Sequence, residues 1–517
     1  MLTHNPSPQP LPPSPGANAP CPQPLTPSPG ADAPCPQPLA PSPGANAPSP
    51  QPLAPSPGAQ SAPSAPLRTL LTIATFAILL AGLSRVVHGV EPPNLEIAPA
   101  IVEFTPDLTP LKPWRPHVAP ESAANPPAIF AGNGIRPTLD DRHGALDRFY
   151  AALWRTERRE PMAITRILHY GDSPTTADLI TGDTRQLLQK RFGDAGHGFT
   201  LIGKPWAWYE HRGVELSSYG WQMDPATRWD LRNGLFGLGG VAFSSSTGAY
   251  SRVTLRDPNE TSLEVWYLRQ PDGGSLEISA GGRPIGSIAT GGPSRTAGFA
   301  GFTLTPGTGT LDFSATGPVR IFGITLEKAH TGVVYDSIGL NGASISVPAL
   351  LFNESHWAQE LRHRRPDLVI LNYGTNESSF AAFLTREYEI ELREAIRRVR
   401  AALPDTSILV MSPMDRGEKN GGAIETLPTI PRIVEIQRRV AAGLHCGFFD
   451  TFEVMGGAGT MERWYESQPR LVSADFIHPT PAGARIIATA FVRELTAGLN
   501  RYKLRQVLSR NETAGAR

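Results

Sequence analysis

The segment "AITRILHYGDS" (residues 163–173) decides which kind of fold this chain adopts. Its apolar residues form a short run that ends at Gly171, which is typical of a buried strand followed by a tight turn. Helices are predicted on both sides, over "GALDRFYAALWRTER" (144–158) and "ADLITGDTRQLLQKRF" (177–192). An alternation of helix, strand and helix is typical of an α/β domain.

The same alternation returns after residue 333. The runs "PDLVILNYG" (366–374), "TSILVMSP" (406–413) and "CGFFD" (446–450) read as buried strands. Amphipathic helices are predicted between them, over 385–403 and 430–444. Apolar strands followed by amphipathic helices predict a mainly parallel sheet that is covered on both faces.

Between these two parts, residues 206–328 have a different texture. Short β-type runs such as "SLEVWYLR", "TLDFSAT" and "VRIFGITLEK" are separated by Gly, Pro, Asp and Asn. Short strands with frequent turn residues predict an all-β sandwich. We therefore expect one discontinuous α/β domain, formed by 139–205 and 329–505, that is interrupted by an inserted β module at 206–328.

The N-terminal region is predicted to contain no globular structure. Prolines crowd residues 1–67, where "PSPG" recurs at 13, 27, 41 and 55, so we expect a disordered spacer. Residues 68–87 hold a low-polarity run between Arg68 and Arg85, and we expect a single membrane anchor that leaves the C-terminal part exported. A cleaved signal peptide with secretion is the alternative. Residues 88–138 are rich in proline and predict an extended stalk.

Composition excludes several classes of function. The chain has 517 residues, with 47 basic and 47 acidic side chains, and it has no dense basic cluster, so nucleic-acid binding is not expected. Only Cys446 of the three cysteines lies in the globular part, where we expect it to be packed as an apolar residue. Metal-ligand spacing of the Cys/His kind is absent. We expect neither a metal nor another cofactor.

Chemistry-bearing residues fall at the predicted carboxyl ends of strands, where an α/β sheet forms its ligand crevice. Ser173 follows the first strand, and Asp475 and His478 lie in "SADFIHP" just before the last helix. A serine becomes nucleophilic when a histidine takes its proton and a carboxylate orients that histidine. Ser173 alone would be read as a helix cap, since Ser before a helix satisfies free amides. The Asp-x-x-His spacing of Asp475 and His478 favours the interpretation of Ser173 as a nucleophile rather than as a helix cap.

Donors for an oxyanion are also present. The backbone N–H groups of Ser173 and Gly342 and the side-chain amide of Asn376 are the candidates, with Gly339 as an alternative to Gly342. Asn376 as a mere helix cap, and Gly342 as a mere turn residue, are the structural alternatives.

Four short blocks carry a resemblance to the SGNH/GDSL hydrolase family. They are "GDS" (171–173), "GLNGAS" (339–344), "GTNES" (374–378) and "DFIHP" (475–479), in the order in which that family has them. The resemblance implies a flavodoxin-like three-layer domain over about 145–205 and 333–500. It also implies Ser173 as nucleophile, His478 as base, Asp475 as its partner, and Ser173, Gly342 and Asn376 as the oxyanion hole.

Two features depart from the family's pattern. Pro174 follows the nucleophile, which fixes φ and removes an N–H near the site, and the interval between Ser173 and Gly342 is unusually long. The β insertion in that interval is similar to the arrangement in bacterial peptidoglycan O-acetylesterases and related polysaccharide deacetylases, where the extra module resembles a carbohydrate-binding domain.

The sequence thus predicts a membrane-tethered, exported serine esterase that removes O-acetyl groups from envelope polysaccharide or peptidoglycan. One alternative is an O-acyltransferase that uses the same triad, and another is a noncatalytic carbohydrate-binding surface protein. Asp415 and Arg416, at another strand end, are weaker candidates for lining the substrate crevice. The aromatic residues of "PWAWYEHR" either pack at the domain junction or stack on sugar rings; they are Trp206, Trp208 and Tyr209.

Overall fold

The structure is a computed structural model that describes residues 138–228 and 233–515. The predicted spacer, membrane anchor and stalk lie outside these residues, apart from residue 138. Within the described part, no helix has the length and apolar character that crossing a membrane requires.

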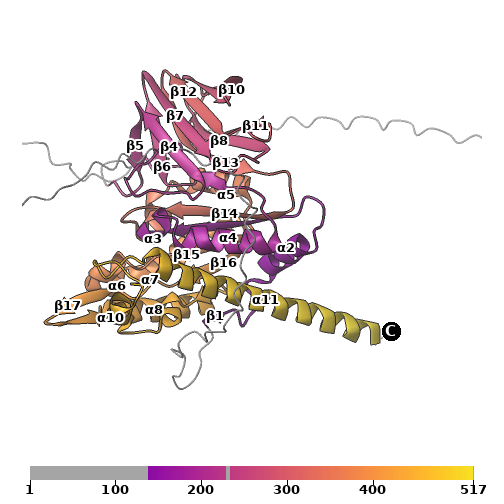
Figure 1. The fold of residues 1–517 in the computed structure, drawn as a ribbon. Coiled ribbons are helices and arrows are strands. Elements are labelled where there is room, and N and C mark those ends of the chain that lie inside the picture. The colour runs from indigo at the N-terminus through magenta and orange to yellow at the C-terminus, as the bar shows by residue number, and fades with distance from the viewer. Residues whose placement is uncertain (1–137, 229–232, 516–517) are drawn as a thin grey trace, which may run out of the picture. The chain divides into compact units, whose positions relative to one another are not determined.

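A six-stranded sheet forms the centre of the α/β part (Figure 1). Four of its five strand pairings are parallel, and at one edge β1 runs antiparallel to β19. The order is β1 (Leu139–Asp140), β19 (Gly447–Phe449), β16 (Ser407–Met411), β15 (Leu368–Asn372), β2 (Ile164–Gly171) and β14 (Gly332–Gly339). The predicted parallel sheet is therefore confirmed.

Helices cover both faces of this sheet, because side chains along each strand point alternately to either side. In β15, Val369 and Leu371 join one apolar cluster, whereas Leu368 and Ile370 join the other. One face packs against α2 (Asp147–Glu157), α4 (Ile180–Phe192) and α11 (Pro481–Gly515). The other packs against α5 (Glu354–Arg364), α7 (Tyr388–Ala402) and α8 (Thr429–Gly443). This is the three-layer α/β architecture expected from the sequence.

The inserted region forms two antiparallel sheets, as the short β-type runs predict. One has the order β10 (Arg283–Ala289), β9 (Ser275–Ala280), β12 (Thr310–Thr316), β7 (Gly248–Leu255) and β4 (Val214–Tyr219). The other has the order β11 (Thr296–Thr303), β8 (Ser262–Arg269), β13 (Val319–Glu327), β6 (Val241–Ser245) and β5 (Gln222–Pro225). In addition, β3 (Gly198–Thr200) pairs with β13, so strand pairing to the insert begins before residue 206.

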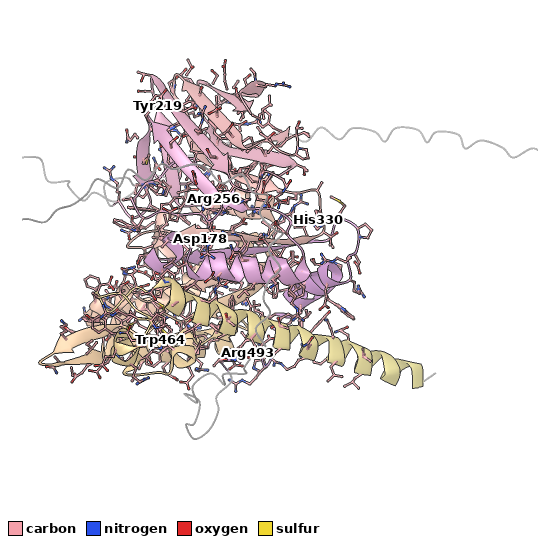
Figure 2. All side chains as sticks on the ribbon, viewed as in Figure 1. Asp178, Tyr219, Arg256, His330, Trp464 and Arg493 are labelled. Carbon is pink, nitrogen blue, oxygen red and sulfur yellow. The ribbon has the colours of Figure 1, made fainter. Side chains whose placement is uncertain are left out.

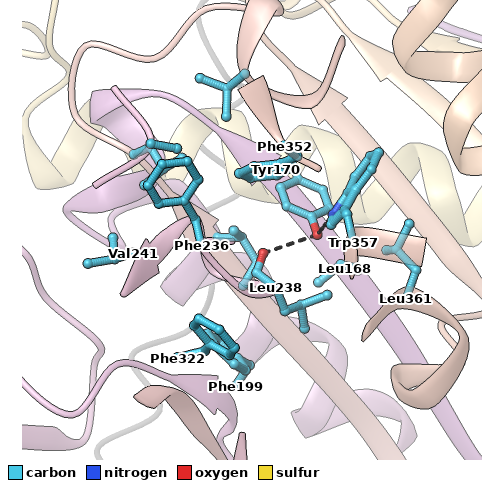
Figure 3. Packing of buried hydrophobic residues seen from close by; sticks show 14 of the residues in the cluster. Leu168, Tyr170, Phe199, Phe236, Leu238, Val241, Phe322, Phe352, Trp357 and Leu361 are labelled. Atoms are coloured by element: carbon cyan, nitrogen blue, oxygen red, sulfur yellow. Dashed lines mark hydrogen bonds between the residues drawn. The ribbon is translucent and has the colours of Figure 1, made fainter. Parts of the chain in front are cut away.

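The insert and the α/β part share one hydrophobic core rather than meeting at a thin interface. Leu168 and Tyr170 of β2 belong to the same buried cluster as Phe322 of β13 (Figure 3). The Tyr170 hydroxyl donates to the carbonyl of Leu238 at 3.2 Å and accepts the indole N–H of Trp357 at 2.8 Å. Removing the insert would therefore expose core residues of the α/β part.

Shorter elements complete the described chain. They are α3 (Ser173–Thr176), the π-helical turn Val347–Leu351, the 3-10 turn Glu377–Ser379, α6 (Ala381–Arg386), the hairpin β17 (Gly417–Asn420) and β18 (Ala423–Thr426), α9 (Thr451–Met455) and α10 (Thr460–Glu466). The predicted helix 177–192 is observed as α4, which begins at Ile180, and the short helix α3 precedes it.

Three strands end at the same level of the sheet. Gly171, the last residue of β2, pairs with Gly339 of β14 on one side and with Asn372 of β15 on the other. The loops that follow these strands contain Ser173, Gly342 and Asn376. The strand register therefore brings three of the four sequence blocks to one edge of the sheet.

Candidate active site

Ser173 is the first residue of α3 and is held against the sheet by two glycines. A Cβ at Gly171 would lie 2.2 Å from the Thr175 Oγ1, and a Cβ at Gly339 would lie 2.1 Å from the Thr176 backbone nitrogen. Only residues without a side chain allow α3 to approach the ends of β2 and β14 this closely. Pro174 takes a position in the first turn of α3, where a helix has no internal partner for an N–H, so this departure from the family pattern fits the fold.

The structure brings Ser173, His478 and Asp475 together into one hydrogen-bonded chain. Ser173 Oγ lies 2.8 Å from His478 Nε2, although 305 residues separate the two in sequence. His478 Nδ1 lies 2.6 Å from Asp475 Oδ2. Ser173 is 9 % exposed, whereas the His478 side chain is 38 % exposed. The imidazole therefore connects a mostly buried hydroxyl to a carboxylate at the surface.

The Asp475 carboxylate is held in its ionised form, in which it accepts a hydrogen bond from His478 Nδ1–H. Partial burial works to raise its pKa, but hydrogen bonds from the His478 ring and from the backbone N–H groups of His478 and Ile477 outweigh it and lower the pKa. Both backbone bonds to Asp475 Oδ1 measure 3.0 Å. An ionised carboxylate fixed in this way selects the tautomer that carries the proton on Nδ1 and leaves Nε2 free to accept.

The candidate oxyanion donors lie in the loops that follow β2, β14 and β15, whose ends pair with one another. Gly342 sits in a turn at φ 70° with open space on its Cβ side. Among the described residues, the N–H groups of Ser173 and Gly342 have no protein acceptor. The Asn376 amide donates to the Ala343 carbonyl at 2.7 Å and does not cap the following turn. A primary amide has two N–H donors, so this bond leaves one for a ligand.

Glu377 is a residue of the site that sequence reasoning missed. Its carboxylate is buried and accepts the Ile345 N–H at 2.8 Å with one oxygen and the Gly374 N–H at 3.0 Å with the other. Burial raises the pKa of Glu377 to about 7, against the effect of these donors. The side chain links the loop of Gly342 to the loop of Asn376. Its place beside Asn376 was the only available signal, and a sequence does not reveal which backbone groups a buried carboxylate meets.

Asp172, the residue before Ser173, is buried. Burial raises its pKa to about 6, and a hydrogen bond with Thr375 acts in the opposite direction. Its backbone carbonyl accepts the N–H groups of Thr175 and Thr176 at 3.1 and 3.0 Å. The residue thus supports the turn into α3.

Asp415 and Arg416 hold the surrounding loops. Asp415 is 1 % exposed and accepts the N–H groups of Arg416 and Met461 and the Thr426 hydroxyl. With its oxygens so engaged, it ties the β17–β18 hairpin to α10. Arg416 donates to the Thr375 carbonyl at 2.9 Å and to Ser379 Oγ at 2.8 Å. It therefore braces the loop that follows Asn376.

A pocket of about 320 Å³ opens beside the nucleophile. It is lined by Ser173, Pro174, Ala177, Leu179, Trp208, Asn341, Ser473, His478 and Pro479. The three aromatic residues of the motif that contains Trp208 differ in their exposure. Tyr209 is buried and Trp206 packs against the core, as a packing role predicts, whereas Trp208 is 52 % exposed and faces the pocket.

The chain is similar to known proteins in sequence and in fold. Residues 294–486 match the model of the GDSL-like Lipase/Acylhydrolase family. The matched residues include Gly342, Asn376, Asp475 and His478, while Ser173 precedes them on the far side of the insert. No curated protein matches the chain.

Among solved structures, a peptidoglycan O-acetylesterase is 23% identical with a TM-score of 0.62, covering 70% of this chain and 99% of its own. An acetylxylan esterase from Geobacillus stearothermophilus is 21% identical with a TM-score of 0.25, covering 32% of this chain and 73% of its own. A family two carbohydrate esterase from Clostridium thermocellum is 12% identical with a TM-score of 0.24, covering 54% of this chain and 99% of its own.

The first of these similarities establishes the fold, and the family model establishes the kind of domain. Residues 294–486 therefore carry a GDSL-like lipase/acylhydrolase domain, the described chain has the SGNH hydrolase fold with a β insertion, and the protein is an ester-hydrolysing enzyme.

Proposed function

We propose that this protein is an exported serine esterase that removes O-acetyl groups from a cell-envelope polysaccharide or from peptidoglycan. The observation that carries the proposal is the continuous chain from Ser173 Oγ to His478 Nε2 at 2.8 Å and from His478 Nδ1 to Asp475 at 2.6 Å. These separations allow proton transfer without rearrangement of the site.

In this proposal, Ser173 Oγ attacks the acetyl carbonyl carbon while His478 Nε2 takes the hydroxyl proton. The tetrahedral oxyanion is held by the N–H groups of Ser173 and Gly342 and by the free amide hydrogen of Asn376. His478 then returns its proton to the departing sugar oxygen. Asp475 stays ionised and stabilises the imidazolium that forms between these two steps.

Water completes the cycle. It attacks the acetyl-serine, gives a proton to His478, and releases acetate as Ser173 regains its hydrogen. The 38 % exposure of the His478 side chain favours this outcome over transfer to a second sugar, because solvent reaches the base directly.

The substrate class rests on two separate considerations. The solved structure that shares this fold is described as a peptidoglycan O-acetylesterase. Export rests on the low-polarity run at 68–87, since a protein outside the cytoplasm meets envelope polymers.

Acetate release from a panel of polymers tests the proposal. The purified protein should release acetate from O-acetylated peptidoglycan or from O-acetylated polysaccharide, and Ser173→Ala should abolish this release. Ser294→Ala, an exposed serine of the insert, is the matched control. Acetate release by Ser173→Ala at the wild-type rate would refute Ser173 as the nucleophile. If the wild-type protein releases no acetate from any polymer of the panel, the substrate class is refuted.

A further inference from the structure

The loop between β3 and β4 carries an aromatic ring to the mouth of the catalytic pocket. Trp208 lies in this loop, in a turn, and is 52 % exposed. It lines the same pocket as Ser173 and His478. An exposed indole beside a nucleophile is available to whatever part of the substrate lies next to the ester.

The ring is held in place from both ends of its loop. Its Nε1–H donates to the Asn341 side-chain oxygen at 3.2 Å, next to the turn of Gly342. The Glu210 N–H donates to the Thr176 carbonyl of α3 at 3.1 Å, and the buried Tyr209 hydroxyl accepts the Leu201 N–H at 3.1 Å. The indole is therefore fixed relative to the nucleophile before any substrate binds, which reduces the entropy lost on binding.

The pocket around Trp208 has the chemistry of a site for an uncharged ring. Pro174, Ala177, Leu179 and Pro479 make its wall mostly apolar, and His478 is the one ionisable side chain among its lining residues. Asn341 and Ser473 add polar groups that suit hydroxyls. A pyranose presents an apolar C–H face and a polar rim, and a flat indole with nearby hydrogen-bonding groups complements both.

Resting on the function proposed above, we infer that Trp208 is a specificity-determining residue, which stacks on the pyranose ring that carries the ester and thereby presents the acetyl carbonyl to Ser173. The substrate class is then an O-acetylated pyranose in which the ring itself is recognised. A small acetate ester without a sugar does not use this contact.

The test compares two substrates on matched variants. The probes are p-nitrophenyl acetate and an oligosaccharide of N-acetylglucosamine that carries an O-acetyl group on a primary hydroxyl. For Trp208→Ala, the ratio of kcat/KM on the oligosaccharide to kcat/KM on p-nitrophenyl acetate should fall about tenfold, mainly through a higher KM for the sugar. Trp208→Phe retains an aromatic face and should recover part of that ratio.

Tyr219→Ala is the control for loss of a surface aromatic. Tyr219 is 70 % exposed on β4 and stacks on Tyr250, outside the pocket. Figure 2 shows it at the far end of the insert from Asp178, which follows α3. A ratio unchanged in Trp208→Ala, or lowered equally in Tyr219→Ala, overturns the stacking role while the esterase proposal stands. Absence of acetate release from the oligosaccharide by the wild type overturns this substrate class and the stacking role together.

Discussion

Glu377 accepts the backbone N–H of Ile345 at 2.8 Å across 32 residues of sequence. Its second carboxylate oxygen accepts the Gly374 N–H at 3.0 Å. Because Ile345 follows the Gly342 turn and Gly374 precedes Asn376, one buried side chain sets the spacing of two proposed oxyanion donors. The Asn376 bond to the Ala343 carbonyl joins the same two loops a second time.

Substitution of Glu377 by Gln should therefore impair catalysis without direct contact with the substrate. Gln offers one acceptor oxygen instead of two, so one loop loses its partner and the donors lose their alignment. We expect kcat on p-nitrophenyl acetate to fall about 10- to 100-fold, with a smaller change in KM. Glu389→Gln, which changes a half-buried carboxylate that pairs with Arg393 and Arg439, is the matched control. Wild-type kcat in Glu377→Gln would rule out the positioning role.

Replacement of Asp475 by Asn tests the orientation of His478. The amide retains the shape of the carboxylate but favours the other imidazole tautomer and does not stabilise an imidazolium. We expect kcat to fall by about 10³- to 10⁴-fold, as in other serine hydrolases with this arrangement. Asp272→Asn, an exposed position in the insert, is the comparison. A kcat of Asp475→Asn within tenfold of the wild-type value would mean that Asp475 does not orient His478.

The two strand-end glycines give a steric prediction. Gly339→Ala would place its Cβ 2.1 Å from the Thr176 backbone nitrogen, so α3 must move away from the sheet and carry Ser173 with it. We expect a loss of about 1–3 kcal/mol in the free energy of unfolding together with a lower kcat. In Gly301→Ala the new Cβ has no atom within 4 Å, so the free energy of unfolding and kcat should stay nearly unchanged. Urea unfolding and ester turnover on the same preparations measure the two effects.

Glu360 makes stability depend on pH. Burial raises its pKa to about 8, from an ordinary value of 4.5, despite the bond from the Leu238 N–H. A carboxyl whose pKa is higher in the folded state binds more protons when folded, so the free energy of unfolding falls as pH rises from about 4.5 to about 8. Nearby His356 has its pKa lowered by burial from 6.5 to about 4, so it makes stability rise with pH between these values; the wild type and a Glu360 variant share this effect.

Glu360→Gln should remove this dependence, since the amide keeps an oxygen for Leu238 and does not ionise. Above pH 8 the variant should exceed the wild type in free energy of unfolding by about 1–3 kcal/mol, and the advantage should shrink toward pH 5. Urea unfolding at pH 5, 7 and 8.5 measures it, with Glu354→Gln at the exposed start of the same helix as control. A constant difference across these pH values would contradict the prediction.

The sequence was sufficient to predict the fold class and which candidate residues the chain brings together, because both depend on local patterns. Strand and helix periodicities are local, and the carboxyl ends of parallel strands always meet at one edge of a sheet. Ser173, Gly342 and Asn376 each follow such a strand, so their place at one edge of the sheet could be predicted. The Asp-x-x-His spacing likewise predicts the bond within that pair.

Only the tertiary structure decided which side chains are buried, which groups they contact, and where strand pairing to the insert begins. Asp415 lies at a strand end like the site residues, yet its oxygens are taken by Met461, Thr426 and Arg416. Glu377 gained its role from backbone groups on another loop, and Trp208 was left exposed while Tyr209 beside it was buried. The insert shares its core with β2 because pairing and packing across distant segments are set by burial of the whole chain, and burial is a property that no local window of sequence contains.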